Sequence, residues 1–216
     1  MTKKVINQNP KLNKELIDTI EPKFIFSDKP INRFKILETG NGAQQSNKEE
    51  LIENLKHQIN SIENCKLKEN SKKIVLSEGN INSHLMLIGE APGIEEEELG
   101  VPFRGEVGEL LNKMLLAISV KRKDIYTCYA INFRPPDDRK PTSTEIKRYS
   151  VFLKEHISIV NPKIIVLMGA SEMEEVTGMN EKIYTERGHW KEVILKNKTF
   201  DVMITINKTY VIRGPE

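Results

Sequence analysis

The chain has 216 residues, and its 33 lysines and arginines nearly balance its 31 aspartates and glutamates, which leaves a formal net charge of +2. This length suits one α/β domain with a sizeable core, and the balance excludes a strongly basic or acidic protein but leaves nucleic acid open as a partner. The two cysteines, Cys65 and Cys128, favour a reducing compartment, and no apolar run approaches the ~20 residues of a membrane span, so we expect a cytoplasmic protein.

The first elements along the chain are an arm and a helix. Residues 1–47 are rich in lysine, asparagine and proline, and we expect an extended or disordered arm that ends in a linker. A domain over residues 48–216 follows. Ser46 and Glu49 have the spacing of a capping box, which predicts a helix whose apolar face carries Leu51, Ile52, Leu55, Ile59 and Ile62.

Strands and helices alternate in the rest of the domain. Strands are expected at 85–88, 124–131 and 163–169, and helices at 105–118, 141–160 and 171–178. The helix at 105–118 is expected to bury Leu110, Leu111, Met114, Leu115 and Ile118, and Thr142 with Glu145 predicts a capping box at the next long helix. Residues 190–195 and 200–206 predict a terminal hairpin or two edge strands. The alternation predicts an α/β fold with three αβα layers around a central, mostly parallel four-stranded sheet.

The segment "GEAPG", residues 89–93, follows the first buried strand. Ligand sites in such sheets form beyond the carboxyl ends of the strands. Gly89 and Gly93 allow a tight turn and a close approach of the backbone, and Pro92 stiffens that turn. Glu90 is placed to position a water or accept a proton, although an ordinary strand-to-helix connection has the same composition. We expect the acidic run Glu95–Glu98 to be solvated loop surface.

Five segments in a fixed order extend this pattern. They are "SEGN", "LMLIGEAPG", "GVPFRGEVGELLNKML", "FRPPDDRKPTSTEI" and "PKIIVLMGA". In order and spacing this series resembles the family 4 uracil-DNA glycosylases, the bacterial and archaeal repair enzymes that usually carry a four-iron–four-sulfur cluster. The resemblance covers residues 65–169, with weaker similarity out to Arg213.

The resemblance implies a function and a set of site residues. A DNA glycosylase takes a base out of the stack, holds it in a pocket and cleaves the bond between base and sugar. Glu90 then assists the attacking water, and Phe103 stacks on the extruded uracil, although a packing aromatic is the alternative for Phe103. The pocket would be lined by Gly89, Ala91, Pro92 and Gly93. Contacts to DNA are implied for Arg134, Arg139 and Arg213, for which ordinary surface arginines are the alternative.

Two positions differ from the family pattern. Tyr129 stands where the family has the asparagine that reads uracil, and a phenol offers one polar group where an amide offers two. Asn132 lies three residues further on and is expected to face the opposite side of the strand. Asn207 stands where the family has a histidine that stabilises the departing uracil anion. Losing one such donor typically lowers the rate by ~10²–10³.

The cluster positions differ as well. The family's four cysteines correspond to Ile62, Cys65, Phe133 and Tyr149, so that a single thiol remains and we expect no cofactor. The replacements are apolar or aromatic, which is what we expect where side chains fill the volume of the cluster. The four histidines do not have the close spacing of a zinc site. The chain also ends before the family's closing helix, and we expect a shortened member.

Three functions remain open. The chain could be a cluster-free DNA glycosylase of base-excision repair with impaired activity, in which Glu90 and Asn207 are catalytic. It could be a module of the same fold that binds DNA or a protein without cutting, or an inactive remnant. We expect a monomer whose partner is uracil-containing DNA, bound weakly, and no association with a membrane.

Overall fold

The central element is a sheet with a parallel core. The structure is a computed structural model, and it describes residues 41–169 and 187–205. In these ranges six strands form one sheet in the order β1-β3-β2-β4-β6-β5. They are β1 (Ser77–Gly79), β2 (Leu85–Gly89), β3 (Tyr126–Tyr129), β4 (Ile164–Met168), β5 (Trp190–Leu195) and β6 (Lys198–Thr205). The inner strands β3, β2, β4 and β6 are parallel, and β1 and β5 pair antiparallel at the two edges.

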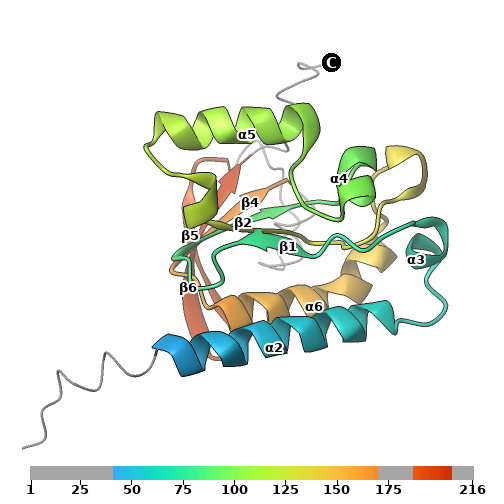
Figure 1. Cartoon of the computed structure of the whole chain (residues 1–216), viewed down its shortest axis with the longest axis horizontal. Coiled ribbons are helices and arrows are strands. Elements are labelled where there is room, and N and C mark those ends of the chain that lie inside the picture. Colours follow the sequence, from blue (N-terminus) through green and yellow to red (C-terminus); the bar gives the residue numbers. More distant parts are fainter. Residues whose placement is uncertain (1–40, 170–186, 206–216) are drawn as a thin grey trace, which may run out of the picture. The chain divides into compact units, whose positions relative to one another are not determined.

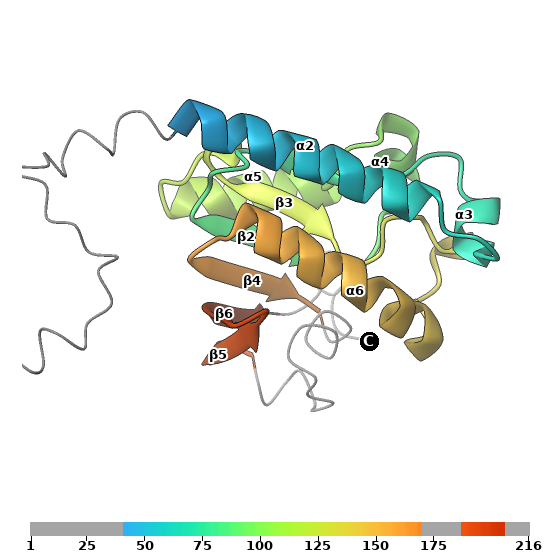
Figure 2. The same cartoon turned by 90° about the horizontal axis from the view of Figure 1, so that it is seen from below.

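Helices cover both faces of this sheet. α5 (Gly105–Ala117) lies on one face, and α2 (Asn41–Asn60) and α6 (Ser143–Val160) lie side by side on the other (Figures 1 and 2). Two short helices, α3 (Lys66–Asn70) and α4 (Ile94–Leu99), lie in the connections, as do two 3₁₀ turns at Arg122–Asp124 and Pro136–Asp138. The predicted three-layer α/β class is confirmed, and the expected four strands are the centre of a six-stranded sheet.

The strands are buried on both faces, as their continuous apolar sequences predict. Met86 and Ile88 of β2 pack with Leu153 and Ile157 of α6 in one apolar cluster. Leu87, between them in sequence, belongs instead to the cluster that contains Leu111 and Leu115 of α5. Successive side chains of β2 therefore support the two helical layers in turn.

The predicted start of α6 agrees with the structure, and the predicted start of α2 does not. Thr142 caps α6: its side chain accepts a hydrogen bond from the Glu145 backbone N–H at 3.3 Å, and the Glu145 carboxylate accepts one from the Thr142 N–H at 2.7 Å. By contrast, α2 begins at Asn41, so Ser46 lies inside the helix and is not its cap. Residues 41–47, predicted as linker, therefore belong to α2.

The core face of α5 differs from the prediction. Leu111 and Leu115 are buried, but Met114 and Ile118 are 47% and 65% exposed. Gly108 is also buried, and a Cβ there would lie 2.2 Å from the carbonyl oxygen of Phe103. The chain at Phe103 therefore lies against the Gly108 side of α5, where a larger side chain has no room.

The end of the described chain is a hairpin. β5 and β6 pair antiparallel, and β6 also pairs in parallel with β4. Of the two predicted alternatives the hairpin is thus confirmed, with β6 inside the sheet. The predicted helix at 171–178 lies outside the described residues. None of the described helices is long and apolar enough to cross a membrane.

Candidate functional site

The candidate site lies at the carboxyl edge of the sheet, where β2 and β3 end side by side. Gly89 and Tyr129 are the last residues of these strands and are paired in register. The pairing continues beyond the strands, because the Ala130 N–H donates to the Gly89 carbonyl at 2.7 Å and the Ile131 N–H donates to the Glu90 carbonyl at 3.0 Å. The backbone of Glu90 is thus fixed, and its half-buried side chain starts from a rigid strand end.

The GEAPG turn leads directly into α4. Gly93 is the N-cap of this helix, and its N–H donates to Glu96 Oε2 at 3.0 Å. Ala91 packs against an apolar cluster centred on Tyr149, and Pro92 is buried. The turn is therefore held at both ends, by the sheet at Gly89 and by the Glu96 carboxylate at Gly93.

Only part of the acidic run is the solvated surface that the sequence predicts, because Glu95 and Glu98 are exposed but the two glutamates between them are not. Glu96 and Glu97 are 5% and 3% exposed. Glu97 accepts hydrogen bonds from Ser71 Oγ at 2.5 Å and the Lys72 N–H at 2.9 Å, and Arg134 Nη1 lies 3.6 Å away. Burial opposes the charge of Glu97, but these donors outweigh it and lower the pKa of this carboxyl. The run therefore anchors α4 to the residues before β1.

Phe103 is buried next to the turn in an uncommon backbone conformation. Its φ is 56°, in the left-handed region that a bulky side chain rarely adopts, and its side chain is 2% exposed. A Cβ on Gly89 would lie 3.0 Å from the tip of its ring, so the turn and the ring are in direct contact. The Arg122 guanidinium lies 5.3 Å from the centre of the ring. Backbone strain of this kind occurs where the surrounding structure fixes a functional side chain.

Tyr129 lies against both Gly89 and Phe103. Its ring is stacked on that of Phe103, with centroids 4.9 Å apart and an interplanar angle of 29°. Burial raises the pKa of Tyr129 well above its ordinary value, and the nearby Glu96 carboxylate raises this pKa further. Asn132 is buried, and its amide nitrogen donates to the Val75 carbonyl at 3.2 Å.

A partly exposed charge cluster supports the Phe103 loop and was not predicted. Glu78 of β1 accepts hydrogen bonds from Arg104 and, at 3.0 Å, from Arg122. Arg122 also donates to the Pro102 carbonyl at 3.1 Å. The segment "SEGN" contains Glu78, but its sequence shows no partner, because both arginines come from distant parts of the chain.

The arginines expected to contact DNA are engaged within the chain. Arg139 forms a two-bond ion pair with Glu145, at 2.7 and 2.9 Å, and Arg134 pairs with Asp138 at 2.6 Å. The hydrogen bond from Arg139 is the main reason that the pKa of Glu145 is lowered to about 2. Two further predicted residues, Asn207 and Arg213, lie outside the described residues.

The four predicted cluster positions converge in the structure. Cys65, Phe133 and Tyr149 are buried in one apolar cluster, which we call the Tyr149 cluster, and the partly buried Ile62 packs against it. Cys65 Sγ and the Tyr149 hydroxyl oxygen lie 3.4 Å apart in a hydrogen bond. The other buried members are Leu55, Ile59, Leu67, Leu76, Ile131, Ile146 and Ile159.

These residues do not fit an iron–sulfur cluster. Isoleucine and phenylalanine have no metal-binding atom, and a cluster needs four thiolates or close substitutes. In the described part of the chain, no group of three or more histidine, cysteine, aspartate or glutamate side chains could hold a metal ion. The aromatic side chains occupy the space between α2, α6 and the segment from Ile62 to Cys65.

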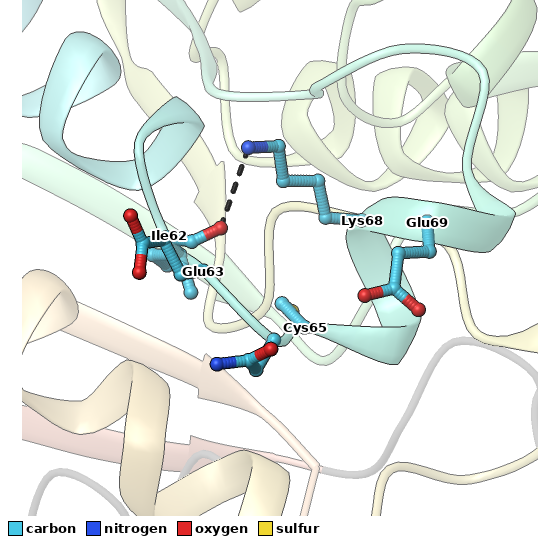
Figure 3. Close-up of a pocket in the computed structure, with 6 residues that line it drawn as sticks. Ile62, Glu63, Cys65, Lys68 and Glu69 are labelled. Atoms are coloured by element: carbon cyan, nitrogen blue, oxygen red, sulfur yellow. Dashed lines mark hydrogen bonds between the residues drawn. The ribbon is translucent and has the colours of Figure 1, made fainter.

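The surface next to this segment is hollowed. A hollow of about 420 Å³ is lined by Ile62, Glu63, Asn64, Cys65, Lys68 and Glu69 (Figure 3). The Lys68 ammonium donates to the Ile62 carbonyl at 3.3 Å, and Arg148 donates to the Asn64 carbonyl at 2.8 Å. Cationic side chains thus hold the backbone of the segment. This hollow borders the Tyr149 cluster and not the Gly89 turn, so it is not the predicted base pocket.

A comparison with known families agrees with this fold. Residues 76–216 match the family described as the uracil DNA glycosylase superfamily. The chain therefore belongs to the uracil DNA glycosylase superfamily.

Individual relatives narrow this class. The chain is 34% identical over 168 residues to the Type-4 uracil-DNA glycosylase of Thermotoga maritima, which covers 77% of this chain and 86% of the relative. It is 30% identical over 168 residues to the Type-4 enzyme of Pyrobaculum aerophilum, with 76% and 86% covered. It is 33% identical over 156 residues to that of Sulfurisphaera tokodaii, with 67% and 71% covered. The predicted resemblance to family 4 is confirmed.

Proposed function

We propose that this chain is a uracil-DNA glycosylase of base-excision repair that hydrolyses the N-glycosidic bond of uracil in DNA with impaired activity. The observation that carries the proposal is the contact between the Gly89 turn and the ring of Phe103, which brings the two main motif segments together at one strand end. The named function of the Type-4 relatives supports the same chemistry. We propose that the protein acts as a monomer and binds DNA weakly.

The chemistry follows from the side chains at this edge. An extruded uracil would stack on Phe103, and Glu90 would hold a water below the sugar and accept its proton. The water oxygen would bond to C1′ as the bond from C1′ to the base nitrogen breaks. The electron pair of that bond would leave with the uracil, and Asn207 would donate a hydrogen bond to the resulting anion.

Two features support impaired activity. Asn207 is a neutral amide where the family has a histidine, and the loss of one such donor lowers rates by ~10²–10³. In addition, the Tyr129 ring lies against the Gly89 turn, where a base must approach. We therefore expect excision far slower than that of the Type-4 relatives, but above the uncatalysed rate.

The test is an excision assay on a uracil-containing oligonucleotide, followed by alkaline cleavage at abasic sites. Glu90→Ala should abolish cutting. Glu98→Ala is the matched control, because Glu98 is an exposed glutamate of the adjacent α4, and it should leave the rate unchanged. Cutting that persists in Glu90→Ala at the unmodified rate would remove Glu90 from the proposed mechanism.

A second function is a module that binds DNA without cutting it. The burial of the Tyr129 ring beside Phe103 favours this alternative, because the ring lies where an extruded base would stack on Phe103. Binding that weakens with salt, measured on the same oligonucleotide and with no abasic product, would support the module. Arg139→Ala should then weaken binding equally for uracil and thymine, because we propose that this 40% exposed arginine contacts phosphate.

A further inference from the structure

The Tyr129 side chain packs against both the Gly89 turn and Phe103, which also contact each other. Even a methyl group on Gly89 would lie 2.7 Å from Cε1 and 2.9 Å from Cδ1 of the Tyr129 ring. Tyr129 is 1% exposed and Phe103 is 2% exposed. A base cannot lie against both Gly89 and Phe103 while the Tyr129 ring is in this position.

The Tyr129 ring makes the stacking contact that a base would make. Offset aromatic pairs have centroids ~4.5–7 Å apart, and the 4.9 Å separation and 29° angle of Tyr129 and Phe103 lie in that range. Glycosylases hold an extruded base by the same kind of stacking, together with hydrogen bonds to its edge. Phe103 therefore already has a planar partner on the face that it shares with Tyr129.

The Tyr129 hydroxyl also makes polar contacts of the kind that a base edge makes. It accepts a hydrogen bond from the Phe103 N–H at 3.1 Å and donates one to Glu96 Oε1 at 2.8 Å. An acceptor beside a donor is the pattern at O4 and N3–H of uracil. The other oxygen of Glu96 caps Gly93, so the same carboxylate connects Tyr129 to the GEAPG turn.

We infer that Tyr129 occupies the position of the extruded base and must leave it before any base can bind. This inference rests on the proposed function for its substrate, uracil in DNA. Only molecules in which Tyr129 has left the site can bind a base. The apparent affinity for the base is therefore the intrinsic affinity multiplied by the fraction of such molecules. Substitutions that remove the ring, or release its hydroxyl, should therefore raise base binding and excision in graded steps.

The test uses the full chain and two variants. Tyr129→Asn removes the ring, and we expect excision from a uracil oligonucleotide to rise by about a hundredfold, in line with a closed site in roughly 99% of molecules. Tyr129→Phe keeps the volume and stacking but loses both hydrogen bonds, so a rise of about tenfold is expected. It also keeps the inference testable if Tyr129→Asn fails to fold, which circular dichroism would show.

A second readout separates this inference from the proposed function. Free uracil should bind Tyr129→Asn more tightly than the unmodified chain by a similar factor, measured by titration calorimetry. Tighter binding of uracil without excision by any variant would support the inference and overturn the proposed function. In another outcome, the unmodified chain excises uracil, and both folded variants have the same excision rate and the same uracil affinity as the unmodified chain. That result would support the proposed function and overturn the inference. Folded variants that neither bind uracil more tightly nor cut faster would also overturn it.

Discussion

His156 of α6 offers a quantitative test of the packing that supports the site. Its side chain is 2% exposed. Its ring lies edge-on to that of Tyr126 in β3, with centroids 5.5 Å apart. His156 Nε2 and the Tyr126 hydroxyl oxygen are hydrogen-bonded at 2.9 Å, and that hydroxyl donates to Ser77 Oγ of β1 at 2.8 Å. This buried chain joins α6 to two strands at one edge of the sheet.

The loss of folding stability on acidification can be calculated from the pKa of His156 in the folded and the unfolded chain. Burial lowers the pKa of His156 from 6.5 to about 4, because the charged imidazole loses its hydration. The folded pKa is depressed, so the unfolded chain binds more protons between these values, and stability is lost as the pH falls through the window. For an unfolded pKa of 6.5 and a folded pKa of about 4, acidification from about pH 7.5 to about pH 5 removes about 2 kcal/mol.

Urea unfolding at these two pH values, followed by circular dichroism, measures this loss. His156→Gln cannot titrate, so it should be less stable than the unmodified chain at the higher pH but should lose about 2 kcal/mol less on acidification. His84→Gln is the matched control, because His84 is exposed, and it should lose as much as the unmodified chain. Equal losses in all three proteins would refute the assignment of His156 as a buried neutral base.

Three further predictions follow from the site. The purified protein should be colourless and contain no stoichiometric iron, and a chelator should not shift its unfolding midpoint. A brown sample with stoichiometric iron would contradict the conclusion that the residues of the Tyr149 cluster cannot hold an iron–sulfur cluster. Gly89→Ala should destabilise the fold by about 1–3 kcal/mol in urea unfolding, because its methyl group overlaps the Tyr129 ring. Glu97→Gln should cost about 1–3 kcal/mol through its lost charge-assisted bonds, whereas Glu98→Gln at the neighbouring exposed position should cost almost nothing; equal stability of the two glutamine variants would argue against a buried anchor.

The sequence predicted the parts of the fold that depend on local pattern. Buried strands such as β2 and the cap of α6 at Thr142 are encoded in runs of neighbouring residues. The sequence did not predict the burial of Glu96 and Glu97, because the partners of these carboxylates, Tyr129 and Ser71, lie 33 and 26 positions away along the chain. A run of glutamates has the same pattern whether or not distant donors cover it.

The candidate site was predictable in its position but not in its contents. Motif order placed Gly89 and Phe103 at one strand end, and the structure brings them into contact. The sequence alone indicated that Tyr129 stands where an asparagine that contacts uracil was expected. That its ring would stack on Phe103 depends on the three-dimensional register of β2 and β3, which pairs Gly89 with Tyr129. A residue type indicates a missing contact, but only coordinates show what takes its place.

The predicted cluster positions and the predicted base-reading position share a physical character. At the cluster positions Tyr149 and Phe133 are buried, and at the base-reading position Tyr129 is buried. In both places an aromatic ring supplies apolar area and its hydroxyl, where present, finds a polar partner. Ala91 packs on the Tyr149 cluster and Gly89 on Tyr129, so the same turn is supported by both replacements. Tyr129 and Tyr149 thus both support the fold around the GEAPG turn, and we expect any gain of activity in Tyr129→Asn to come with a loss of stability.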